Sequence, residues 1–423
     1  MALNFLLVPI LIVFLDKVAY GIWVTVFSIV NWIFTFDIGI GQGLRNKLTE
    51  ALSRNDRATA SALVSTAYIL MTIFAVVILI IGTILILVID FQQALNYTAE
   101  ANGYLQLFVF LSLVFTVLNF ILSLYKKLYL AIHQSYVIEL VSSIFLSAYL
   151  LCIFLLNSFG QSGNLITLIL IFGLLNIVIS ITATILFFRT KKELGMRSGY
   201  FNKTLAKSLF GLGSNFFLIN ISLLIILSTD NIIISNMLGP SFVTDYTVVQ
   251  RLFQLLVVGF GVILAASWGL YSEAIVKKDY DWIYGNLKKM NLLYLAIFVV
   301  GIGLFFCIDL VLNIWLGDTP IHLPEGLVLG NLIYALMFCF TNIYFYFINA
   351  TGKIKLQMYL YIIGAIINIP LSIYLVGVLE SSTGVILSTI ICTLPLTIAM
   401  PIQTKLILSN FRKGNIAKKP DGI

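Results

Sequence analysis

The chain has 423 residues, of which 60% are hydrophobic and only 10% are charged. Soluble domains carry about 25% charged residues, so a water-soluble globule of this length would lack the polar surface that it needs. The formal net charge is +7, but the basic residues lie in short loops between apolar runs, which argues against a nucleic-acid partner. The composition therefore indicates a membrane protein and excludes a soluble enzyme domain.

Apolar runs long enough to cross a bilayer as a helix, about 20 residues, recur along the whole chain. We expect an all-α polytopic membrane protein with about twelve transmembrane helices. The first run covers only part of the roughly 30 Å apolar core. We interpret it as a clipped first helix, not a signal peptide, because no basic segment precedes it. The expected spans are roughly 2–15, 20–43, 61–89, 104–125, 137–157, 165–188, 209–237, 246–269, 290–316, 327–350, 358–379 and 384–408.

Basic residues sort almost completely to one side of these spans. The loops on the side of both termini hold 23 of the 25 lysine and arginine residues, and the opposite loops hold only Lys17. The positive-inside rule therefore predicts that both termini are cytoplasmic. The four cysteines lie in apolar runs, the two histidines are far apart, and no phosphate-binding loop motif is present. We expect no metal site, no ATP hydrolysis and no cofactor.

Two cytoplasmic loops share one pattern. Residues 50–56 read Glu-Ala-Leu-Ser-Arg-Asn-Asp and residues 273–279 read Glu-Ala-Ile-Val-Lys-Lys-Asp, at an offset of 273 − 50 = 223. Both loops follow a span that runs inward. We therefore predict two pseudo-symmetric six-helix lobes around a central cavity, as in transporters built from parallel repeats. The predicted parts are an N-terminal lobe 1–188, a cytoplasmic linker 189–208, a C-terminal lobe 209–408 and a basic cytoplasmic tail 409–423.

Charged side chains inside the expected spans are few, and such groups usually face a cavity or a partner. Asp37 lies near the inner end of the second span, Asp230 in the seventh and Arg251 in the eighth. Asp230 and Arg251 lie at similar depth on consecutive spans, so an ion pair between them is a hypothesis. Such a pair would either line a substrate pathway or only join two helices.

Polar residues recur at helical spacing on several spans. A single stripe is explained most simply by helix packing, whereas several together favour a hydrated central cavity. Asn31 and Asn342 are further candidates for the substrate pathway. The stripes are Asn119, Ser123 and Lys127; Asn176, Ser180 and Thr184; and Asn331, Asn342 and Asn349.

Three alternating glycines, at positions 39, 41 and 43, precede Arg45 and Lys47 at the expected cytoplasmic end of the second span. Glycines loosen a helix end and permit close backbone approach. An arginine can bind a diphosphate through two parallel hydrogen bonds, so Arg45 is a candidate for substrate capture. We interpret Lys47 as a contact to lipid headgroups.

Several segments together resemble bacterial O-antigen and polysaccharide-repeat flippases of the multidrug/oligosaccharidyl-lipid/polysaccharide (MOP) exporter superfamily. The resemblance covers nearly the whole chain, except that the family has a full first helix. The segments that carry it are 19–23 (Ala-Tyr-Gly-Ile-Trp), 36–48 (Phe-Asp-Ile-Gly-Ile-Gly-Gln-Gly-Leu-Arg-Asn-Lys-Leu), 64–68 (Val-Ser-Thr-Ala-Tyr), 230–235 (Asp-Asn-Ile-Ile-Ile-Ser), 238–240 (Leu-Gly-Pro), Val243 to Tyr246, and 349–354 (Asn-Ala-Thr-Gly-Lys-Ile).

This resemblance implies a non-enzymatic function: moving an undecaprenyl-diphosphate-linked oligosaccharide from the cytoplasmic to the periplasmic leaflet by alternating access, for surface polysaccharide biosynthesis. It implies a bacterial inner-membrane location, contact with membrane lipids, and a polysaccharide polymerase and a chain-length regulator as partners. The coupling ion, H⁺ or Na⁺, stays open.

Three alternatives remain. One is a peptidoglycan-precursor flippase, although that group commonly has more than twelve spans. A multidrug exporter of the same superfamily would use acidic cavity residues, for which Asp37 and Asp230 are candidates. A membrane polymerase or ligase would carry a large outer loop with basic residues, and the outer loops here are short and nearly free of them. We therefore favour the flippase.

Overall fold

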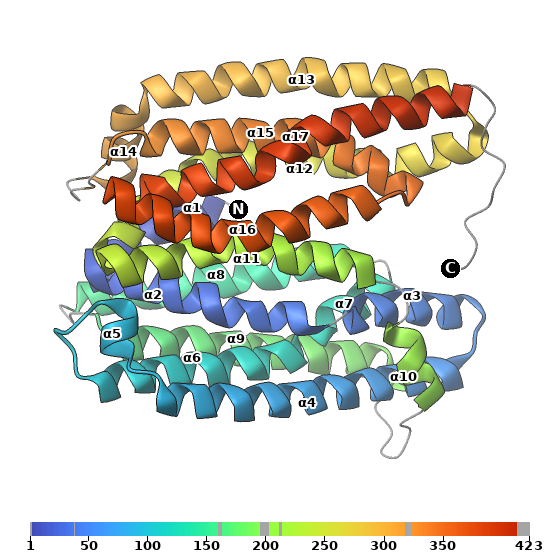
Figure 1. Ribbon diagram of the computed structural model, residues 1–423. Coiled ribbons are helices and arrows are strands. Elements are labelled where there is room, and N and C mark those ends of the chain that lie inside the picture. The colour runs from blue at the N-terminus through green and yellow to red at the C-terminus, as the bar shows by residue number, and fades with distance from the viewer. Residues whose placement is uncertain are drawn as a thin grey trace. The chain divides into compact units, whose positions relative to one another are not determined.

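The structure is a computed structural model that describes residues 2–37, 39–132, 134–159, 163–194, 203–210, 214–317, 321 and 323–412. The regular elements of these residues are helices, and no strand occurs among them (Figure 1). The chain divides into two compact units. The first comprises Met1–Phe217 with Gly239–Ser241, and the second comprises Leu218–Leu238 with Phe242–Ile423. The predicted lobe boundaries, linker and tail stay predictions, and residues 195–202 and 413–423 lie outside the described part.

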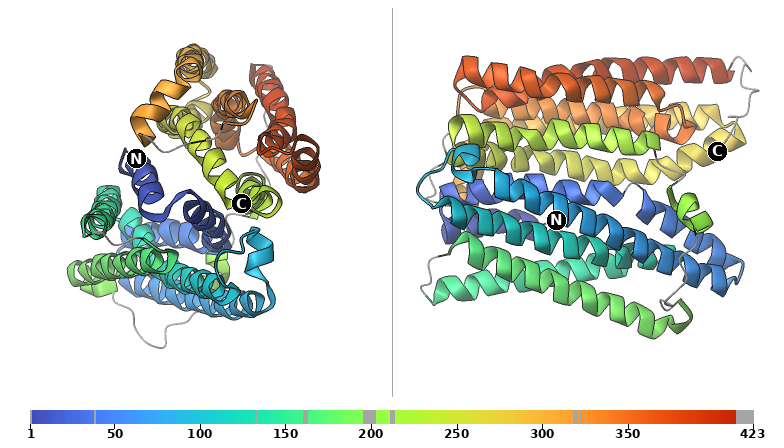
Figure 2. Two further views of the ribbon diagram at one scale, coloured as in Figure 1. Left: turned by 90° about the vertical axis from the view of Figure 1, so that its left-hand side faces the viewer. Right: turned by 60° about the horizontal axis from the view of Figure 1, so that its bottom comes forward.

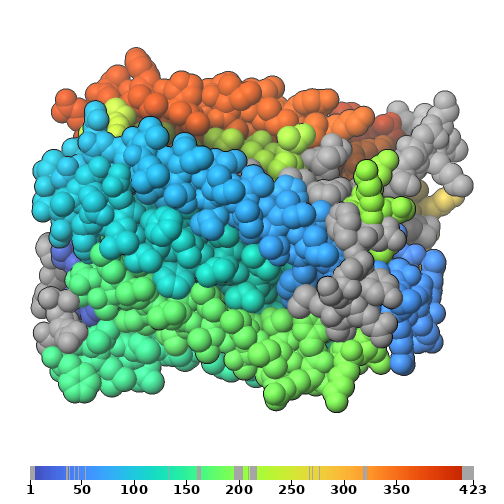
Figure 3. All heavy atoms as spheres, turned by 90° about the horizontal axis from the view of Figure 1, so that it is seen from below, coloured from blue at the N-terminus to red at the C-terminus, as the bar shows by residue number. Residues whose placement is uncertain are grey.

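Eleven helices of the described chain are long and apolar enough to cross a membrane, and a shorter apolar helix, Phe5–Leu15, precedes them. The all-helical, roughly twelve-helix prediction is therefore confirmed, including the short first run. Large apolar side chains such as Ile80, Leu87 and Val178 are exposed, as expected for a surface that faces lipid. Figure 3 shows part of such a surface in the first unit, where α4 (blue), α6 (cyan) and α9 (green) follow one another.

In the first unit, α6 packs against α4 and α9, α3 packs against α4 and α7, and α1 packs against α8. The predicted second span, 20–43, covers most of α2, all of η1 and the first turn of α3. The elements are α1 (Ala2–Leu15), α2 (Lys17–Val30), the 3₁₀ helix η1 (Asn31–Asp37), α3 (Ile40–Ser53), α4 (Arg57–Val88), α5 (Phe91–Leu95), α6 (Asn102–Leu122), α7 (Leu124–Ala131), α8 (Ser135–Ser158), α9 (Leu165–Thr190), the 3₁₀ helix η2 (Lys192–Leu194) and α10 (Lys203–Phe210).

In the second unit, α17 packs against α15 and α16, and α13 packs against α14 and α15. The left view of Figure 2 looks along the helix axes, so the long helices of each unit are seen end on. The elements are α11 (Ser214–Leu238), α12 (Pro240–Lys277), α13 (Tyr280–Phe306), α14 (Ile308–Leu316), α15 (Leu327–Thr351), α16 (Lys355–Leu379) and α17 (Thr383–Arg412). The first residues of α11 (214–217) and of α12 (240–241) belong to the first unit.

The two repeated loops have the same atomic geometry. Asp56 and Asp279 each cap the next helix by accepting a 3.0 Å hydrogen bond from the backbone three residues on. The residue before each aspartate has a positive φ, 56° at Asn55 and 59° at Lys278. In both loops the first glutamate pairs with the basic residue four positions on. This agreement supports the internal repeat, because each feature recurs at the same offset of 279 − 56 = 223.

The repeat also exposes one difference between the halves. Helix α12 begins at Pro240 and α2 at Lys17, again 240 − 17 = 223 residues apart. Helix α12 then continues unbroken to Lys277, whereas the equivalent segment is interrupted by η1 between α2 and α3. An interrupted helix at membrane depth is tolerated where it lines a cavity or is enclosed by protein, which directs attention to the residues around η1.

Candidate functional site

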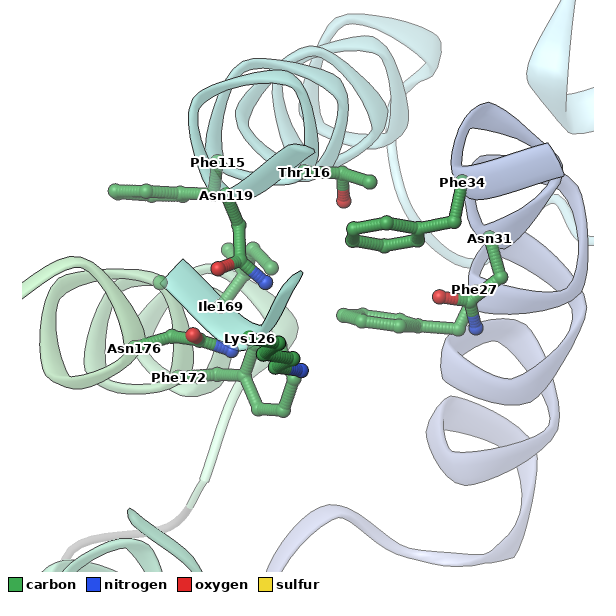
Figure 4. Close-up of a pocket in the computed structure, with 11 residues that line it drawn as sticks. Phe27, Asn31, Phe34, Phe115, Thr116, Asn119, Lys126, Ile169, Phe172 and Asn176 are labelled. Atoms are coloured by element: carbon green, nitrogen blue, oxygen red, sulfur yellow. The ribbon is translucent and has the colours of Figure 1, made fainter. Parts of the chain in front are cut away.

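A cavity of about 270 Å³ lies in the first unit beside the interrupted span. Helix α2 and η1 form one side, and α6, α7 and α9 form the other, as Figure 4 shows. Its walls combine aromatic rings, amide side chains and one ammonium group. The lining residues are Phe27, Asn31, Phe34, Phe115, Thr116, Asn119, Lys126, Ile169, Phe172, Gly173 and Asn176.

Aromatic rings give the cavity its shape. The rings of Phe27 and Phe172 are in edge-to-face contact, with centroids 5.2 Å apart, and Phe27 stacks on Trp23 at 4.2 Å. The Phe34 side chain is 37% exposed. A Cβ at Gly173 would lie 2.2 Å from the Phe115 ring, so this glycine lets the ring pack against α9. Fixed aromatic faces of this kind suit stacking on rings or on the apolar face of a sugar.

Two predicted polar stripes meet at this cavity. The Ser180 hydroxyl on α9 lies 3.3 Å from Asn176 Oδ1 and 3.4 Å from Asn119 Oδ1, and it can donate to either oxygen. Both asparagines line the cavity, so the stripes join two helices and also face the open space. The lysine of the stripe, Lys127, is not a lining residue, and its neighbour Lys126 lines the cavity instead.

The predicted site residues of the second span have different surroundings. Asn31 lines the cavity. Asp37 accepts hydrogen bonds from the backbone of Gly39 (2.6 Å) and Gly41 (3.3 Å), and so caps the start of α3. Arg45 is exposed on α3 and forms no ion pair with a described residue. Arg45 therefore stays available for a ligand, whereas Asp37 already has a structural role.

The glycines before Arg45 serve contacts within the unit. A Cβ at Gly41 would meet Asp37 Oδ2 at 2.6 Å, and one at Gly43 would meet the backbone oxygen of Leu209, in α10, at 2.3 Å. Gly39 has φ +81°, in the left-handed region where a glycine is favoured. The prediction of close backbone approach is right, but the described partners are protein groups.

Lys47 forms an ion pair with Glu50 at 3.1 Å. This hydrogen bond and the charge of Lys47, together with the charge of Arg54 at 2.9 Å, hold the pKa of Glu50 below its ordinary value. The headgroup contact predicted for Lys47 stays a prediction, since the ion pair leaves the lysine partly exposed.

The other predicted residues, Asp230, Arg251 and Asn342, belong to the second unit. Asp230 is only 1% exposed, and its Oδ2 accepts a 2.7 Å hydrogen bond from the Tyr246 hydroxyl. The ion pair predicted between Asp230 and Arg251 is absent from the described ion pairs. Tyr246 takes the place of Arg251 because five residues turn an α-helix by about 140°, so the two side chains of α12 point in different directions.

Buried polar groups surround Asp230. Thr389 on α17 lies beside the carboxylate, and Asn368 Nδ2 on α16 lies 3.4 Å from the Thr389 hydroxyl. The second carboxylate oxygen, Oδ1, accepts no hydrogen bond from a described residue. Asn342 lies half-buried on α15. Among the described residues, no group of three or more His, Cys, Asp or Glu side chains could hold a metal ion.

Comparisons with known proteins agree with this architecture. No family model matches the chain. It is 22% identical over 360 residues to the "Putative O-antigen export protein" of Yersinia pseudotuberculosis, covering 84% of this chain and 80% of that protein. It is also 34% identical over 95 residues to the "Putative O-antigen transporter" of Salmonella typhimurium, covering 22% of this chain and 21% of that one.

Solved structures show the same fold. An inward-facing multidrug resistance MATE family transporter of the MOP superfamily superposes with a TM-score of 0.82 at 14% identity, over 97% of this chain and 95% of the other. An outward-facing transporter of that family gives 0.64, also at 14% identity, over 94% and 89%. The chain is therefore a multi-pass membrane protein with the fold of MATE transporters of the MOP superfamily, and its sequence relatives are named as O-antigen transport proteins, as its motifs predict.

Proposed function

We propose that this protein is a flippase that moves an undecaprenyl-diphosphate-linked oligosaccharide repeat unit from the cytoplasmic to the periplasmic leaflet of the bacterial inner membrane. The names of the sequence relatives support a role in O-antigen export, and the fold is that of a transporter superfamily. A sugar-diphosphate headgroup cannot cross hydrocarbon unaided, since each unsatisfied polar group costs several kcal/mol. The protein replaces the lost water and breaks no covalent bond.

The observation that carries this proposal is the chemistry of the first unit's cavity. Aromatic faces at Phe27 and Phe172 suit sugar rings, amides at Asn31, Asn119 and Asn176 suit hydroxyl groups, and the single charge that lines the cavity is a lysine. The competing multidrug exporter of cations would need acidic groups there, and none of the lining residues is acidic. Asp37, which the sequence offered as an acidic cavity residue for such an exporter, caps α3 instead.

We further propose the course of transport. Arg45, which is exposed and forms no ion pair with a described residue, captures the diphosphate at the cytoplasmic face. The headgroup then enters the first unit's cavity while the polyprenyl tail stays in lipid, and rocking of the two lobes exposes the headgroup to the other side. A polysaccharide polymerase and a chain-length regulator would receive the product.

Energy coupling is a separate part of this proposal. The buried Asp230 carboxylate has one oxygen bound by Tyr246 and one without a described hydrogen-bond donor. A buried charge of this kind needs a proton or a cation as its counterpart. We propose that Asp230 takes up the coupling ion, H⁺ or Na⁺, with Thr389 and Asn368 as neighbouring polar groups.

The orientation proposed here places both termini in the cytoplasm. In a protein whose native cysteines are replaced, an impermeant thiol reagent added outside should label a cysteine at Gln93 and not one at Lys192. Both positions are exposed, on α5 and η2 respectively, so access to the reagent depends on the side of the membrane. Labelling of Lys192→Cys alone would reverse the orientation.

The function is tested by complementation. Expression in a strain that lacks its O-antigen flippase should restore surface polysaccharide, measured relative to the amount of protein in the membrane. In the same strain, Arg45→Lys should insert normally but transport poorly, because lysine keeps the charge and loses the planar pair of donors. Lys47→Ala should stay close to wild type. Full activity of Arg45→Lys would leave this arginine with a role in topology only.

A further inference from the structure

The first unit's cavity presents hydrogen-bond donors to the space that it encloses. The amide oxygens of Asn119 and Asn176 both face the Ser180 hydroxyl, at 3.4 Å and 3.3 Å, and the hydroxyl donates to one of them at a time. Figure 4 shows their nitrogens turned toward the open space between the helices. A primary amide has two N–H donors on its nitrogen and acceptor sites on its oxygen, so fixing the oxygen leaves the donors for a ligand.

The one charged side chain that lines the cavity, Lys126, also favours a ligand with hydrogen-bond acceptors. Lys126 is half-buried, lines the cavity and forms no ion pair with a described residue. The nearest ionisable side chains that affect it are Lys127, which has the same charge, and Glu139 on α8, which is exposed and beyond ion-pair distance. The ammonium group lies over the Tyr125 ring, 6.0 Å from its centroid. A ring face does not replace the hydrogen bonds that an ammonium group loses when it leaves water, and a ligand with negative oxygen atoms would restore them.

We propose that Asn119, Asn176 and Lys126 form an oxyanion-binding subsite, with Ser180 as the residue that positions the two amides. Charge-assisted hydrogen bonds from three donor groups suit a phosphate or a carboxylate. At about 270 Å³ the cavity is at the lower limit for a whole small-molecule ligand. It therefore takes one group of the substrate, held with a sugar ring against Phe27 and Phe172.

This inference rests on the proposed function and specifies its substrate further. The oxyanion is either the diphosphate of the lipid carrier or the carboxylate of an acidic sugar. Both present oxygen acceptors to the same donors. The two sources differ in what the site would select: a diphosphate site accepts any repeat unit, whereas a carboxylate site requires an acidic one.

Calorimetry on the purified full-length protein, in discs of uncharged lipid, separates these cases. The ligands are inorganic pyrophosphate, glucuronate and neutral glucose as the control. We expect one of the two anions to bind. Lys126→Gln should weaken that binding about tenfold or more, the loss of one hydrogen bond to a charged group. Asn119→Asp, which replaces an N–H donor with a negative oxygen at constant size, should weaken it at least as much.

The matched control is Lys127→Gln, which removes the same charge one residue away and outside the cavity lining. It should bind like wild type. Ser180→Thr keeps the hydroxyl and should retain binding, whereas Ser180→Ala should lose affinity at an unchanged unfolding temperature. The subsite is refuted when neither anion binds at about 10 mM, or when Lys126→Gln and Lys127→Gln lose affinity equally.

The calorimetric result is independent of complementation. If the wild-type protein restores polysaccharide but Lys126→Gln does not change anion binding, the subsite proposal is refuted and the flippase proposal is retained. If anion binding depends on Lys126 but the protein does not complement, the oxyanion site is retained and the protein transports a different substrate.

Discussion

Replacing Gly21 with alanine is expected to remove most of the folded protein from the membrane. A Cβ at this position of α2 would lie 1.8 Å from the carbonyl oxygen and 2.6 Å from the carbonyl carbon of Pro240, the first residue of α12. Both atoms are backbone, so no side-chain rotation relieves the contact. Overpacking typically costs about 1–3 kcal/mol, and more where the backbone must shift, which is a large part of the stability of a typical protein.

The control is Gly103→Ala, in the first turn of α6, where a Cβ would meet nothing within 4 Å. Alanine there should be neutral or stabilising by about 0.5–1 kcal/mol, because it restricts the unfolded chain. Membrane yield and the thermal unfolding midpoint are the measurements. Equal behaviour of the two variants would show that α2 does not approach Pro240 this closely.

This contact also explains part of a sequence motif. Gly21 belongs to the Ala-Tyr-Gly-Ile-Trp segment that carries the family resemblance, and Pro240 belongs to the Leu-Gly-Pro segment. Two motifs more than 200 residues apart in sequence thus meet in one packing contact. The segments could be recognised from the sequence, but their contact could not, since hydropathy locates each span without its neighbours.

The spans and the repeat could be predicted because local sequence determines them. Apolar length marks each helix, and the aspartates at positions 56 and 279 end each repeated loop by capping the next helix. These features depend on residues within a few positions of one another, so one sequence suffices to find them.

The cavity could be predicted only in part, because a stripe at four-residue spacing drifts around the helix. From Asn119 to Lys127 is eight residues, or about 80° around an α-helix, whereas Lys126, seven residues on, returns to within about 20° of Asn119. Lys126 accordingly lines the cavity in place of Lys127. The sequence did not indicate the four lining phenylalanines, since Phe is common throughout the apolar spans of this chain.

The Asp230–Arg251 hypothesis failed for a related reason. Depth in the membrane follows from position along each span, but the direction of a side chain around the helix does not follow from depth. Tyr246 has a hydroxyl that can donate to the carboxylate and lies on the required side of α12. A neutral donor satisfies one oxygen of Asp230 and leaves its charge unpaired, which is the basis of the last prediction.

Replacing Asp230 with asparagine is expected to reduce transport to the level of the flippase-null strain while the protein remains folded. Asparagine has nearly the same size, and its oxygen can still accept the Tyr246 hydrogen bond seen at 2.7 Å. It has no charge to bind a proton or Na⁺, so the ion-coupled step is lost. A residue with a purely structural role would behave differently, because removing an unpaired buried charge should leave transport intact and raise stability.

Two further variants separate charge from packing. Tyr246→Phe removes the donor and leaves a second carboxylate oxygen without a partner, so it should lower stability by about 1–3 kcal/mol and keep some transport. Asp309→Asn makes the same chemical change as Asp230→Asn at an exposed position of α14 in the same unit, and it should transport normally. The measurements are restored surface polysaccharide per membrane protein and the thermal unfolding midpoint. Because only Asp230 combines complete burial with an unpaired charge in this comparison, wild-type transport by Asp230→Asn would exclude it as the coupling site, whatever its effect on stability.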